Sequence, residues 1–94
     1  MATPVIFKKE QGVMGVVAFF PTIPGTSGWD VTCYAHIGQH ASASLEYMRK
    51  CRPAKSEEYA DLLRELKAIG YDDLRVVRRM SKTMSRERMQ EACR

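Results

Sequence analysis

The segment from Ser56 to Ile69 constrains the fold most, because it carries the pattern of an amphipathic helix. Its apolar residues recur every three or four positions and form one stripe along a helix: Tyr59, Leu62, Leu63, Leu66 and Ile69. Glu57 and Glu58 suit the positive end of the helix dipole, and Gly70 stands where a left-handed cap is needed. A chain with this helix needs an apolar surface to cover the stripe.

Three runs before this helix have the character of β-strands. Residues 4–9 (PVIFKK) and 13–20 (VMGVVAFF) are rich in β-branched and aromatic residues, and the Gly-containing turn between them predicts a hairpin. Residues 29–36 alternate, with Val31 and Cys33 on one side and Thr32 and Tyr34 on the other. This alternation predicts a third, half-buried strand whose Tyr34 side faces water.

Shorter signals complete the prediction. Loops are expected at 21–28 and 37–44, a short helix at 45–50, a fourth strand at the sheet edge over 74–79, and a C-terminal helix near 85–93.

A chain of 94 residues has room for one small core. We therefore expect a two-layer α+β domain over 1–79, followed by a basic tail at 80–94 that forms a short helix. Its antiparallel sheet of three to four strands, in the order β-β-β-α-β, would be covered on one face by the main amphipathic helix.

The net charge of +4 is concentrated in the second half of the chain. Residues 49–94 carry thirteen Lys or Arg against eight Asp or Glu, whereas residues 1–48 carry two against three. Basic clusters attract polyanions, and the arginine fork suits phosphate. The alternative is an ordinary solvated face.

The leading hypothesis is a small non-enzymatic module that binds nucleic acid through its C-terminal strand and tail. The candidate phosphate contacts are Arg75, Arg78, Arg79, Lys82, Arg86 and Arg88, with Tyr34 and His36 as base contacts on an uncovered sheet face. The alternative is a protein-interaction or homodimerisation module that uses the C-terminal helix.

A metal or catalytic site is a further alternative. Cys33, His36, His40 and Cys51 follow the spacing Cys-x2-His-x3-His-x10-Cys, and zinc accepts these ligand types. The strand alternation, however, points Cys33 and His36 in opposite directions. The sequence contains no nucleophile elbow, phosphate-binding loop or dinucleotide fingerprint. We therefore assign no catalytic residue and no cofactor, and we favour a protein that is not an enzyme.

The sequence also predicts a compartment. The longest apolar run, from Val16 to Phe20, is far shorter than a transmembrane helix, and the N-terminus lacks the features of a signal peptide. The three cysteines are an odd number with wide spacing. These features favour a cytoplasmic protein with reduced thiols and no membrane contact.

Three strings carry a resemblance to a family. Pro4-Val-Ile-Phe-Lys, Tyr34-x-His-Ile-Gly-Gln-His40 and Leu66-x-x-Ile-Gly-Tyr71 resemble short uncharacterised proteins of bacteria and their phages or mobile elements. The resemblance covers the chain up to about Arg79 and leaves the tail outside. It implies a compact cytoplasmic domain and carries over no activity, cofactor or catalytic residue.

Overall fold

The computed structural model describes residues 2–9, 15–35 and 39–93. The elements, in chain order, are β1 (Thr3–Lys9), β2 (Val17–Pro24), β3 (Asp30–Ala35), β4 (Gln39–Ser44), α1 (Leu45–Lys50), β5 (Arg52–Pro53), α2 (Ser56–Ala68), β6 (Leu74–Val76) and α3 (Lys82–Ala92). The turn of the predicted hairpin, at 10–14, lies outside the described residues. The α+β class is confirmed.

The strands form one sheet in the order β4-β3-β2-β1-β5, and β6 pairs with β1 beside β5. All pairs are antiparallel except β1 with β6, which is parallel. The described part of the chain thus has six strands where three to four were predicted. The main addition is β4, which lies in the predicted loop 37–44 and pairs with β3 at all six of its positions.

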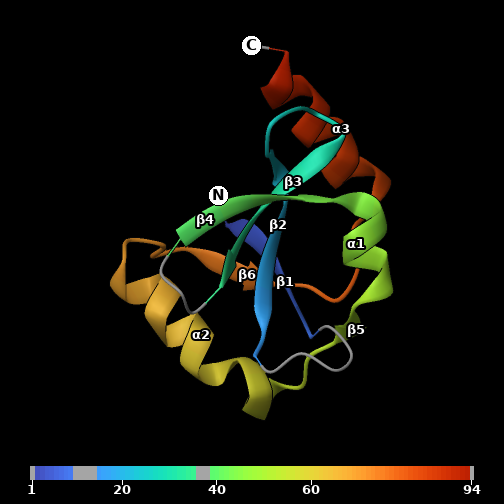
Figure 1. Ribbon diagram of the computed structural model, residues 1–94. Helices are drawn as coiled ribbons and strands as arrows, with labels where there is room; N and C mark the ends of the chain where they lie inside the picture. Colours follow the sequence, from blue (N-terminus) through green and yellow to red (C-terminus); the bar gives the residue numbers. More distant parts are fainter. Residues whose placement is uncertain (1, 10–14, 36–38, 94) are drawn as a thin grey trace.

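Both faces of the sheet are covered, so the prediction of a single covered face is wrong. The cluster on the α2 side consists of Val5, Phe7, Val16, Ala18, Phe20, Tyr34, Leu62 and Leu66. The cluster on the α1 side consists of Ile6, Phe19, Val31, Ala43, Met48 and Cys51. Successive strand residues point to opposite faces, so a continuously apolar strand such as β1 supplies both clusters. Figure 1 shows α1 and α2 on opposite sides of the strands.

Helix α2 confirms the prediction from its apolar stripe. Leu62 and Leu66 are fully buried against the sheet. Gly70 has a φ of 125° and ends the helix in the left-handed region that favours glycine. The next residue, Tyr71, folds back, donating its backbone N–H to the Leu66 carbonyl over 3.0 Å and stacking on Phe20 with ring centroids 5.0 Å apart.

Helix α3 packs against β2, in the region predicted as a basic tail. Ser81 caps it by accepting a hydrogen bond from the Met84 N–H over 3.1 Å. On its inner side Arg88 is only 2% exposed, and its Nε and Nη1 donate to the carbonyls of Gly28 and Pro21, each over 2.9 Å. A buried charge therefore fixes α3 to the end of the sheet. None of the helices described is both long and apolar enough to cross a membrane.

Candidate nucleic-acid interface

One edge of β1 is shared by two short strands. The parallel strand β6 pairs with Thr3 to Val5, and β5 pairs with Lys8 and Lys9 further along. The chain that leaves β6 and the chain that leaves β5 each add one hydrogen bond of 2.9 Å, from Val77 N–H to the Val5 carbonyl and from Ala54 N–H to the Phe7 carbonyl. Residues 52–56 and 76–78, which include the ends of the two strands and the chain that follows each, line a hollow at this edge.

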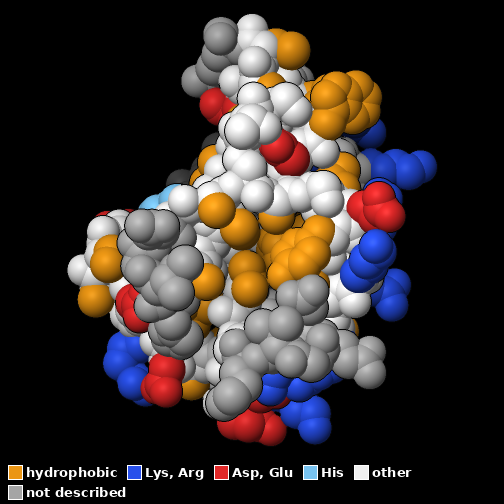
Figure 2. All heavy atoms as spheres, in the orientation of Figure 1, with side chains coloured by type: hydrophobic (Ala, Val, Ile, Leu, Met, Phe, Trp, Pro, Cys, Tyr) orange, Lys and Arg blue, Asp and Glu red, His pale blue; other side chains and the backbone are white. Residues whose placement is uncertain are grey.

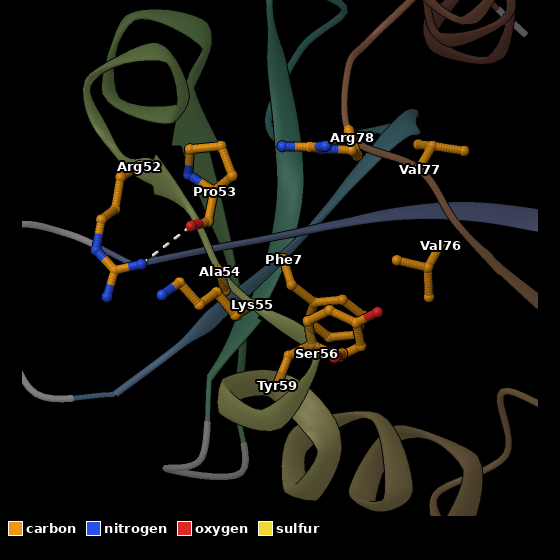
Figure 3. A pocket seen from close by; sticks show the side chains of 10 residues that line it. All are labelled: Phe7, Arg52, Pro53, Ala54, Lys55, Ser56, Tyr59, Val76, Val77 and Arg78. Atoms are coloured by element: carbon orange, nitrogen blue, oxygen red, sulfur yellow. Dashed lines mark hydrogen bonds between the residues drawn. The ribbon is translucent and has the colours of Figure 1, made fainter.

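The first hollow has a volume of about 570 Å³ and lies on the α2 side of this edge. Phe7 and Tyr59 both line it, and their rings are stacked 4.4 Å apart at an interplanar angle of 10°. Figure 3 shows these rings at one end of the hollow and Arg78 beside Pro53 at the other. The remaining walls are Arg52, Ala54, Lys55, Ser56, Val76 and Val77.

The second hollow, of about 240 Å³, lies on the α1 side of the same edge. Its walls are Ile6, Lys8, Met48, Arg49, Arg78, Arg79 and Met80. Lys8 is fixed there, because its Nζ donates to the Met48 carbonyl over 2.9 Å. Arg78 belongs to both hollows, which makes it the link between them.

Six cations line the two hollows, and we call this set the basic edge: Lys8, Arg49, Arg52, Lys55, Arg78 and Arg79. In Figure 2, Lys and Arg side chains gather on the side of the molecule where Figure 1 places α1 and β5. Like charges along one edge raise the local positive potential, which attracts anions.

The members of the basic edge differ in how far their charge is neutralised. Arg52 forms a two-pronged pair with Glu58, with its Nη1 and Nη2 at 3.0 and 2.7 Å from the carboxylate oxygens. Hydrogen bonds from Arg52 and then from the Lys55 backbone lower the pKa of Glu58 to about 2. Among the described residues, no carboxylate pairs with Arg49, Arg78 or Arg79. The charge of these three arginines is therefore open to a ligand.

The residues predicted to hold phosphate do not all meet in one place. Arg78 and Arg79 join the basic edge. Arg75 lines a separate hollow of about 620 Å³ beside α3, which also contains Glu87. Lys82 and Arg86 are exposed on α3. Arg88 is buried and bound to backbone carbonyls, which corrects its assignment as a phosphate contact.

The predicted base contacts on β3 need a second correction. Tyr34 is 3% exposed beneath α2, and its hydroxyl donates to Glu65 Oε2 over 2.6 Å, which is the main cause of its raised pKa. A buried phenol offers no face to a base, because α2 covers the side of β3 that was expected to face water. His36 lies outside the described residues.

The proposed metal ligands are separated by the sheet itself. Cys33 pairs with Ala41 and Tyr34 pairs with His40, so the side chains of Cys33 and His40 point to opposite faces. His40 Nε2 lies 2.8 Å from the Tyr71 hydroxyl. Cys51 is buried, and its thiol donates to the Tyr47 carbonyl over 3.3 Å. Within the described ranges, no three His, Cys, Asp or Glu side chains are placed to share a metal ion.

The sequence pointed to no binding role for the other four cations of the basic edge, which are Lys8, Arg49, Arg52 and Lys55. It also pointed to none for the stacked rings of Phe7 and Tyr59. One local signal was available, since three of the cations follow one another at intervals of three positions in Arg49-x-x-Arg52-x-x-Lys55. The contact between Phe7 and Tyr59 had no such signal, because 52 positions separate the two rings along the chain.

The chain was compared with models of protein families, with curated proteins and with solved structures, and none of the three comparisons gives a match.

Proposed function

We propose that this protein is a small, non-enzymatic module that binds nucleic acid through the basic edge. The observation that carries the proposal is the position of Arg78, which is shared by two hollows and is unpaired with any carboxylate in the described ranges. Arg79 and Arg49 extend the same unpaired charge into the second hollow. Arginine forks of this kind suit the oxygens of consecutive phosphates.

The arrangement favours a polyanion over a single small anion. The cations come from β1, the end of α1, β5, the N-cap of α2 and the chain after β6, so they spread around the sheet edge and do not converge on one point. A nucleic-acid backbone presents charges at regular intervals and can meet several of them together. Each such contact releases condensed counterions, so the affinity should fall as salt rises.

The test is fluorescence anisotropy with labelled single- and double-stranded oligonucleotides across a series of salt concentrations. We expect the double variant Arg78→Glu/Arg79→Glu to weaken binding by roughly tenfold or more at low salt. The magnitude of its salt slope should also fall by about 0.7 per lost phosphate contact on a single strand.

Lys82→Glu/Arg86→Glu is the matched control, because it makes the same change of net charge at exposed positions of α3. The control should retain most of the affinity and the slope. Equal losses in both double variants would show that net charge alone attracts the ligand. No binding by the unmodified protein at low salt would refute the proposed function.

A further inference from the structure

The stacked rings of Phe7 and Tyr59 form one end of the first hollow (Figure 3). Phe7 is 3% exposed and lies in the core, whereas Tyr59 is half-buried over it in the first turn of α2. The near-parallel stack, at 4.4 Å and 10°, holds the outer ring in one orientation. A planar, oriented ring that borders a hollow is the surface on which an unpaired base stacks.

The walls suit a base followed by a phosphate. Pro53, Val76 and Val77 supply apolar surface, and Val76 is 39% exposed. Lys55 and Arg78 add positive charge to the lining (Figure 3). The volume of about 570 Å³ lies in the range of small-ligand sites, ~300–1,000 Å³.

We infer that the Phe7–Tyr59 hollow receives one unpaired base, so that the ligand of the basic edge is single-stranded nucleic acid. The inference rests on the proposed function. A strand that leaves this hollow passes Arg78 and then meets Lys8, Arg49 and Arg79 in the second hollow. A duplex keeps its bases paired and stacked, so it retains only the phosphate contacts.

The first test follows the base directly. A single-stranded DNA of about twelve nucleotides, a length typical of such sites, would carry the fluorescent base 2-aminopurine near its centre. Adjacent bases also quench this fluorophore, so abasic nucleotides would flank it; we then expect the emission to fall as the base stacks on the aromatic ring of the unmodified protein. Salt-dependent binding without quenching would overturn the inference and leave the proposed function standing. This measurement needs no variant and is independent of whether a substitution folds.

The second test separates stacking from charge. Tyr59→Leu keeps an apolar cover over Phe7 but removes the ring, whereas Tyr59→Phe keeps the ring. We expect Tyr59→Leu to abolish the quenching and to weaken single-strand binding on the order of tenfold, within the usual range for one stacked base. Tyr59→Phe should bind as the unmodified protein does, and duplex affinity should be the same in all three.

Two other results have distinct meanings. Equal weakening of single-strand and duplex binding by Tyr59→Leu, with an unchanged circular dichroism spectrum, would assign Tyr59 a structural role and overturn the inference. Displacement of the oligonucleotide by polyglutamate of equal charge, at equal concentration, would also overturn it and indicate an acidic peptide. Failure of both nucleic-acid forms to bind at low salt would remove the proposed function along with the inference.

Discussion

The two arginine-bearing segments on either side of Met80 differ in what surrounds their guanidinium groups. Arg78 and Arg79 precede Met80 and line hollows that open to solvent. Arg88 follows it in α3, is 2% exposed, and donates to two carbonyls and to the Met80 sulfur, the last over 3.1 Å. Residues of one type, ten or fewer positions apart, therefore divide between an open surface, where we propose that a ligand binds, and the packed interior. Burial and hydrogen-bond partners decide which role each takes.

Removal of the buried guanidinium of Arg88 tests most directly whether the two segments differ in role. Arg88→Met fills similar space but leaves the carbonyls of Gly28 and Pro21 without their donor. Hydrogen bonds from a charged group contribute about 1.5–3 kcal/mol each. We expect the free energy of unfolding, from urea denaturation, to fall by about 3 kcal/mol.

The matched control is Arg86→Met, at an exposed position of the same helix. It should change the free energy of unfolding by less than about 0.5 kcal/mol. If Arg88→Met were as mild as Arg86→Met, the two segments would not differ in role, and Arg88 would again be a candidate for phosphate contact.

A smaller effect is expected at Gly28, where α3 approaches the turn before β3. A Cβ at this position would lie 2.7 Å from the Met89 sulfur and 3.2 Å from the Ala92 Cβ. We expect Gly28→Ala to lower the free energy of unfolding by about 1 kcal/mol, the low end for overpacking, because the methionine side chain is able to shift.

A double-mutant cycle with Met89→Ala checks this cause. If the added methyl group strains the contact with Met89, the double variant should lose less stability than the two single variants together. Additive losses would place the strain elsewhere, in the backbone of the turn, and would weaken the argument that α3 is closely docked.

The elements that the sequence predicted well are those whose signals lie close together in the chain. The stripe, the acidic first turn and Gly70 all lie within or next to α2, and they gave its bounds to within one residue. Strand β4 lacked such signals, because its residues QHASAS have little intrinsic preference for a strand. Its conformation comes from pairing with β3 along its whole length, which is a tertiary effect.

The candidate site illustrates the same limit. The basic excess led to Arg78 and Arg79, which are two of the six members of the basic edge. It also led to Arg88, since charge in a sequence carries no information about burial. The coverage of both faces of the sheet could have been predicted, because Val5, Ile6 and Phe7 form a continuous apolar run typical of a strand buried on both faces. With both faces covered, Tyr34 would not have been expected to meet a base.

The smallest effect is expected at Arg52. Glu58 partly neutralises the charge of Arg52, whereas no carboxylate among the described residues pairs with Arg78. Glu58 has a pKa of about 2 in the folded protein, below its ordinary value of 4.5. A lowered pKa means that the ionised carboxylate stabilises the fold. This contribution is present above pH 4.5 and is lost as the pH falls towards 2. The difference in unfolding free energy between the unmodified protein and Glu58→Gln should therefore shrink over this interval.

The same variant also tests whether a cation that is paired with a carboxylate contributes less to ligand binding than an unpaired one. Glu58→Gln releases Arg52 at neutral pH, so single-strand affinity should rise by roughly two- to fivefold, the scale of one exposed ion pair. Glu57→Gln is the control, because this substitution removes the same charge from the same turn. Glu57 is not paired with Arg52. An equal rise in both variants would mean that the ligand senses only the loss of a negative charge near the basic edge. A rise confined to Glu58→Gln would mean that the cations held by Glu58, which are Arg52 at 2.7 Å and Lys9 at 3.7 Å, contribute more to binding once the carboxylate is removed.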